Sequence, residues 1–115
     1  MNDIKVWDKD AALARTIGKE DLLRRVIDAY MAETPALVTK LSEAIKSEDL
    51  ENSAYLAHTI KGASLNISAD RLSELSATIE ASSKAQDQAA VALLMDQLNE
   101  EAEALFAILN SFSAS

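Results

Sequence analysis

The chain of 115 residues has no cysteine, one proline, two glycines and a single histidine. The lack of cysteine excludes disulfides, thiolate chemistry and metal sites with Cys ligands. One histidine is too few for a His-rich metal site. So few turn-forming residues argue against an all-β sandwich or barrel. Gly18 and Gly62 alone cannot build a phosphate-binding loop or a dinucleotide-binding motif.

Positive charge and long apolar runs are also scarce. Eleven Lys and Arg residues stand against 19 Asp and Glu, so the net charge is −8. Repulsion from phosphate argues against a nucleic acid or an anionic membrane as partner. No apolar run reaches the roughly 18 residues needed to cross a bilayer, and the N-terminal ten residues do not resemble a signal peptide. We therefore expect a soluble, cytoplasmic protein.

Apolar residues are plentiful, at 49%, and they recur every three or four positions, as in amphipathic helices. The sequence predicts one all-α domain over residues 1–115, an antiparallel up-down four-helix bundle with a short extra N-terminal helix. Pro35 could start a new helix, but we favour one long helix bent near it. The first two helices are expected over about residues 8–16 and 19–46. A third helix is capped by Ser47, and a fourth covers about 69–83 with Ser68 as its cap. A connection at 82–88 then leads to the last helix. Gly18 is the expected left-handed cap that ends the first helix.

The last helix carries a seven-residue repeat typical of a packed helical seam. The repeat consists of Val91, Leu98, Leu105 and Phe112, with Leu94, Ala102 and Leu109 at the alternate seam positions. The repeat is too short for a free coiled coil, so we expect this helix to pack inside the bundle.

The third helix is predicted to bury one face and to expose His58 on the other. Leu56, Ile60, Ala63 and Ile67 are spaced by 4, 3 and 4 residues, which places them on one face of the helix. His58 then points about 160° away from Ile60, toward water. Ala54, Tyr55, Lys61 and Gly62 lie near it on the helix surface. An isolated exposed His is usually without function, so these neighbours matter.

Gly62 requires an explanation, because glycine inside a helix costs roughly 0.5–1 kcal/mol relative to alanine. Close packing against another helix is one reading. However, Gly62 points outward together with His58, so we favour the approach of a second protein to the helix backbone there.

The segment Ala57–Ile67, AHTIKGASLNI, resembles the signature of the histidine-containing phosphotransfer (HPt) domain, close to A-H-x-[LI]-K-G-[SA]-[SA]-x-[NS]-[LIV]-G. The similarity extends from about Ala14 to Phe112. Leu65 and Ser68 replace residues that are often glycine in the family. Leu65 lies about 20° from His58 in projection, so it adds an apolar contact to the expected docking surface.

The resemblance implies a phosphorelay carrier. His58 would be the nucleophile that accepts a phosphoryl group from a receiver-domain aspartyl phosphate and passes it to another receiver, and Lys61 would offset the new charge. The implied partners are receiver domains of response regulators or of a hybrid sensor kinase. Ala54, Tyr55, Gly62, Leu65 and Glu80 are the candidate contact residues. Glu80 either orients the imidazole by a hydrogen bond or is a solvated surface carboxylate.

No cofactor of its own is expected, because Mg²⁺ and its acidic ligands should belong to the receiver. No ATP site is visible, so we expect a carrier and not an autophosphorylating enzyme. We expect this carrier to be a monomer. The alternative is a helical interaction module with the same bundle and no phosphate relay. A cofactor-binding bundle is less favoured, since one outward His cannot supply a buried metal or haem site.

Overall fold

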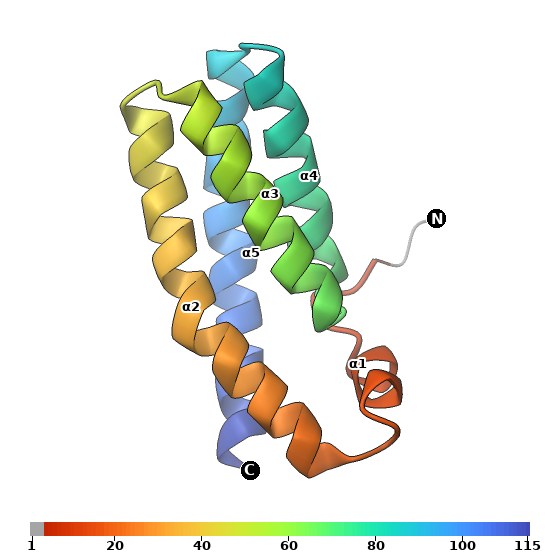
Figure 1. The fold of residues 1–115 in the computed structure, drawn as a ribbon. Coiled ribbons are helices and arrows are strands. Elements are labelled where there is room, and N and C mark those ends of the chain that lie inside the picture. Colours follow the sequence, from red (N-terminus) through yellow and green to blue (C-terminus); the bar gives the residue numbers. More distant parts are fainter. Residues whose placement is uncertain (1–3) are drawn as a thin grey trace.

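A computed structural model of the protein describes residues 4–115, all helical where structure is regular, with no strand in that range. The helices are α1 (Lys9–Arg15), α2 (Glu20–Lys46), α3 (Leu50–Asn66), α4 (Asp70–Lys84) and α5 (Gln88–Ala114). Helices α2 to α5 alternate in direction and form the bundle, as Figure 1 shows. The predicted fold is therefore confirmed. Pro35 lies inside α2, whose ribbon changes direction midway along its length (Figure 1).

Three short turns of the same kind join the bundle helices. Each has a left-handed residue, Glu48, Ser68 or Gln86, with φ near 60°. In each turn the next residue donates its backbone N–H back into the preceding helix, as when Asp49 N donates to Ala44 O at 2.9 Å. This is the Schellman arrangement, which satisfies carbonyls that the helix end leaves free. The connections are three residues long, which forces neighbouring helices to run antiparallel.

The turns differ from the predicted caps in three places. Asp49, not Ser47, caps α3, and its side chain accepts from Asn52 N at 3.2 Å. Ser68 is the left-handed residue of its turn, and α4 starts after Ala69 without a side-chain cap. In the turn after α1, Ile17 takes the left-handed position expected for Gly18, which follows it with φ 74°.

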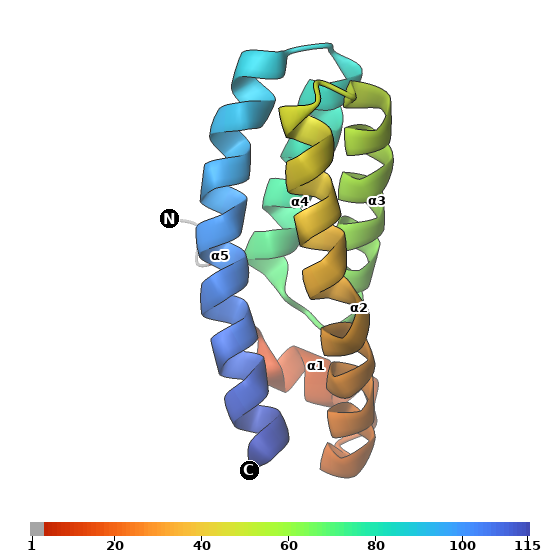
Figure 2. The same ribbon diagram turned by 90° about the vertical axis from the view of Figure 1, so that its left-hand side faces the viewer.

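Helices α2 and α5 have 27 residues each and extend beyond α3 and α4, which have 17 and 15. Helix α1 lies beneath α3 and α4, between these extensions (Figures 1 and 2). Trp7 anchors this segment, because its indole N–H donates to Ile67 O at 2.8 Å and its ring packs edge-on against Phe112. The aromatic residues near the chain ends therefore serve packing.

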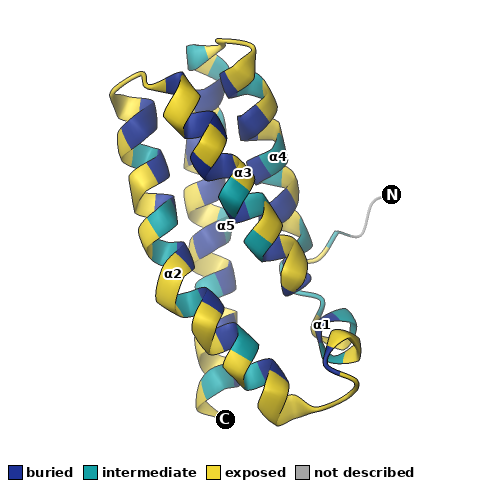
Figure 3. Ribbon diagram, in the orientation of Figure 1, coloured by how far each residue is buried: buried dark blue, intermediate teal, exposed yellow. Residues whose placement is uncertain are grey.

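The core follows the helical periods except in two places. In α3, Ala63 of the expected buried face is only partly buried. Buried residues line the inner face of every bundle helix, and exposed ones the outer face (Figure 3). In α5 the seam position expected for Leu94 is taken by Met95, which is 4% exposed, while Leu94 is only half-buried. Met95 restores the regular alternation of four and three residues from Val91 to Leu98.

Candidate functional site

His58 lies on the outer face of α3, as the helical period predicted. Its side chain is 63% exposed, whereas Ile60, two residues on, is completely buried. Gly62 is exposed on the next turn, and a Cβ added there would meet nothing within 4 Å among residues 4–115 apart from its chain neighbours and the backbone of its own helix. Close helix packing is therefore not the reason for this glycine. The backbone beside the imidazole is open to an approaching molecule.

Glu80 of α4 lies against the imidazole, so the reading of it as a solvated carboxylate is wrong. The Glu80 side chain is only 12% exposed. Its Oε2 lies 3.1 Å and its Oε1 3.3 Å from Nδ1 of His58. Lys61 Nζ donates to Oε1 at 3.1 Å, and Lys84 Nζ donates to Oε2 at 3.0 Å. One buried carboxylate therefore holds three side chains from two helices, and we call these four residues the Glu80 cluster.

The charges of the Glu80 cluster fix the tautomer of the imidazole. The hydrogen bond from Lys84, followed by those from Lys61 and His58, lowers the pKa of Glu80 to about 2, although burial opposes the shift. An ionised carboxylate can only accept hydrogen bonds. Nδ1 of His58 must therefore carry the proton, and in the neutral ring Nε2 carries the free lone pair. The free lone pair therefore lies on the ring nitrogen that does not contact Glu80.

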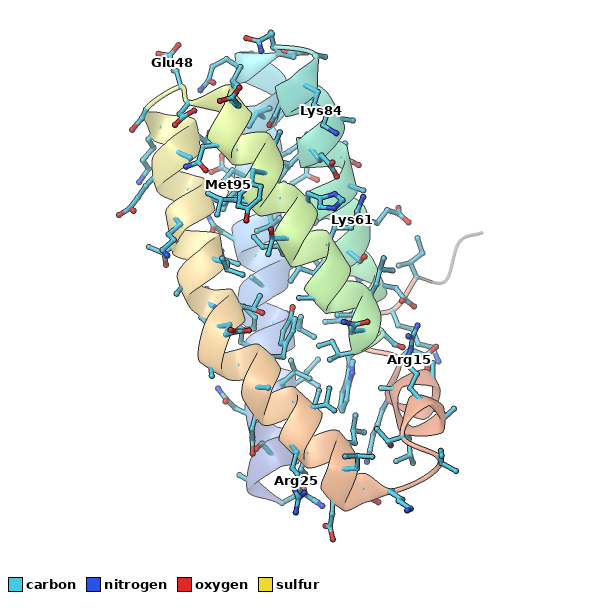
Figure 4. The ribbon with its side chains drawn as sticks, in the orientation of Figure 1. Arg15, Arg25, Glu48, Lys61, Lys84 and Met95 are labelled. Carbon is cyan, nitrogen blue, oxygen red and sulfur yellow. The ribbon has the colours of Figure 1, made fainter. Side chains whose placement is uncertain are left out.

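Lys84 is the member of the cluster that was not predicted from the sequence. It lies one turn after Glu80 on α4, at the i,i+4 spacing of a helical ion pair. That spacing was the available signal. Figure 4 shows Lys61 and Lys84 on the same side of the bundle, from α3 and α4. The site thus has two lysines where one was expected, and Lys61 is already paired with Glu80.

The other predicted contact residues flank the imidazole along α3. Tyr55 is 69% and Leu65 is 48% exposed, so both present apolar surface to solvent. Ala54 is buried instead of open, at 8% exposure. It still lines a surface hollow of about 570 Å³ beside His58, and the other lining residues include Leu50, Tyr55, Glu80, Ser83 and Lys84. This hollow was not predictable from the sequence, because it lies between two helices.

Residues 4–115 contain no group of three or more His, Cys, Asp or Glu side chains suited to hold a metal ion. Within the same residues, none of the helices combines the length and the apolar character that a membrane span requires.

The fold is thus a helical bundle, and its site is an exposed histidine with one ring nitrogen hydrogen-bonded to a buried carboxylate. The family model described as "Hpt domain" matches residues 25–108, a range that includes the whole Glu80 cluster. The chain therefore belongs to the histidine-containing phosphotransfer domain family, and the resemblance found in the sequence is confirmed.

One curated relative supports the same assignment. The "Phosphorelay intermediate protein rdeA" of Dictyostelium discoideum is 25% identical over 108 residues, which cover 94% of this chain and 42% of that protein. The chain thus spans less than half the length of the relative. No solved structure matches the chain. The family match supports a role in histidine phosphotransfer.

Proposed function

We propose that this protein is a phosphorelay carrier that accepts a phosphoryl group on Nε2 of His58 from an aspartyl phosphate of a receiver domain. It then passes the group to the aspartate of another receiver. The observation that carries the proposal is the exposed imidazole whose Nδ1 is held by Glu80 at 3.1 Å. A ring held by one nitrogen offers the other in a fixed direction, as in-line attack requires.

The proposed acceptance step forms one bond and breaks another. The lone pair of Nε2 forms the new P–N bond as the P–O bond to the receiver aspartate breaks, and the bonding electrons leave with the aspartate carboxylate. The ring becomes an imidazolium, and its Nδ1 proton stays on the hydrogen bond to Glu80. The carboxylate stabilises this positive charge, because it lies in direct contact and is largely shielded from water.

The charge of the transferred group calls for cations. A phosphoryl group brings up to about −2, and Lys61 and Lys84 are the ammonium groups of the Glu80 cluster. Phosphoryl transfer also uses Mg²⁺. We assign this ion to the receiver, since Glu80 is already bonded to both lysines. The receiver would dock across the exposed surface of Tyr55, Gly62 and Leu65.

Incubation with a phosphorylated receiver domain, Mg²⁺ and the full chain tests the proposal. We expect an acid-labile, alkali-stable phosphate on the protein, and none on the variant His58→Gln. The chain has no other histidine, so any such phosphate in the wild type is assigned to His58. If no receiver of the source organism loads the wild type, or if His58→Gln still carries the label, the carrier function is wrong. The protein would then be a helical interaction module.

A further inference from the structure

The position of Glu80 has a second consequence, because the carboxylate contacts both lysines as well as the imidazole. Lys61 and Lys84 each place Nζ about 3 Å from one of its two oxygens. The Glu80 side chain is 12% exposed, against 29% for Lys61 and 67% for Lys84. The two ammonium groups can therefore turn toward solvent, whereas the carboxylate is fixed between the helices.

The balance of charge in the cluster is one positive unit, because two lysines face one carboxylate. A phosphoryl group on Nε2 of His58 brings up to about −2. Each lysine that turns toward this group gives up a bond of about 3 Å to a carboxylate shielded from water. The phosphoryl group and Glu80 thus require the same two cations.

We infer that Glu80 limits how firmly the site holds a phosphoryl group, by competing with it for Lys61 and Lys84. The inference rests on the proposed function of His58 as the phosphorylated residue. Glu80 has a positioning role in acceptance and a destabilising role afterwards, and both favour a carrier that releases its group readily.

The chemistry of release agrees with this role. In onward transfer or hydrolysis the P–N bond breaks, and its electron pair returns to Nε2. The leaving group is a neutral imidazole only if Nδ1 keeps its proton until the bond breaks. The carboxylate of Glu80, 3.1 Å from Nδ1, accepts the hydrogen bond from this proton. A neutral amide in its place would still accept the hydrogen bond from Nδ1, but it would release both lysines and stabilise the ring proton less.

The titratable side chains around the imidazole come from both helices. They are Glu80 and Lys84 from α4, and Glu51, Tyr55 and Lys61 from α3.

The experiment loads the full chain with phosphoramidate, a small donor that phosphorylates imidazole without a receiver. After removal of the donor, ³¹P NMR follows the loss of phosphohistidine between about pH 5 and 9, a range that includes the ordinary pKa of an imidazole. The variant is Glu80→Gln, which keeps the shape of the side chain. The matched control is Glu103→Gln, which removes the same charge from an exposed position on α5.

We expect Glu80→Gln to lengthen the half-life of the phosphorylated protein about three- to tenfold, as the release of two partly exposed ion pairs suggests. The midpoint of its pH–rate profile should move to lower pH, which a purely structural role would not cause. Glu103→Gln should behave as the wild type. A half-life in Glu80→Gln that is equal to or shorter than that of the wild type overturns the inference.

A second variant keeps the test decisive if Glu80→Gln is poorly folded by circular dichroism. Lys84→Ala removes a side chain that is 67% exposed, so the fold should tolerate it, and loss of one cation should shorten the half-life. An unchanged half-life in Lys84→Ala contradicts the competition for lysines. Failure of the proposed function is distinguishable, because receivers would then not load His58, whereas phosphoramidate would still report the effect of Glu80.

Discussion

The two faces of α3 differ in what they contribute, although they lie within one turn of each other. The inner face presents Leu56, Ala57 and Ile60, all buried in the core. The outer face presents His58, Gly62 and Leu65, all exposed. Residues of the inner face stabilise the bundle through apolar burial. Residues of the outer face add little to stability and are free to serve a partner.

The first way to test this comparison is to truncate the inner face. Ile60 is completely buried, and replacing a buried Ile by Ala typically costs about 2–5 kcal/mol. We therefore expect Ile60→Ala to lower the free energy of unfolding by that amount, measured by urea denaturation. His58→Gln is the control from the outer face, where substitutions usually change stability by no more than about 0.5 kcal/mol. Equal stability of the two variants would contradict the assignment of the faces.

The assignment of faces was predictable from the sequence, because the helical period alone decides which side of α3 is apolar. The contact between His58 and Glu80 was not. The two residues are 22 positions apart on different helices, and their alignment depends on the three-residue turn between α3 and α4. That turn has Ser68 in the left-handed conformation, which a serine rarely adopts, and the sequence suggested a helix cap at this position instead.

The prediction and the structure also differ where two residues of similar type lie close together in the sequence. Ser47 and Asp49 are both good cap residues two positions apart, and only the geometry of the turn selects Asp49. Leu94 and Met95 are adjacent apolar residues, and the packing of α5 against its neighbours selects Met95. The periods of single helices were thus sufficient for the fold and for the exposure of His58. Contacts between side chains of different helices could not be predicted from these periods and became known only from the structure.

A second test adds bulk to the outer face at Gly62. Apart from its chain neighbours and the backbone of its own helix, a Cβ there meets nothing among residues 4–115 within 4 Å, so Gly62→Ala should stabilise the fold by about 0.5–1 kcal/mol. Gly62→Gln should also fold, but its side chain would stand between a receiver and the imidazole. In-line attack is sensitive to displacements of about 1 Å, so we expect transfer to fall on the order of 10²-fold. Thermal melts and single-turnover transfer rates measure the two effects.

Two results would contradict this view of Gly62. If Gly62→Gln unfolds the bundle, the glycine belongs to the packing of the protein and not to the docking face. If the variant is stable and transfers at the wild-type rate, the receiver does not approach across this part of α3.

The smallest expected effect concerns Lys61, which lies between the two faces. Its side chain is 29% exposed and donates to Glu80 at 3.1 Å. Lys61→Ala removes one of the two cations near the phosphoryl group, while Lys84 still contacts Glu80. We expect transfer to slow by a few-fold, since a partly exposed charge pair contributes at most about 1 kcal/mol. The difference from the wild type should shrink as ionic strength rises, because salt screens the charge. Transfer rates of both proteins, measured at two salt concentrations, check this prediction. Equal rates at low salt would show that Lys61 belongs to the stabilising side of α3 and not to the transfer site.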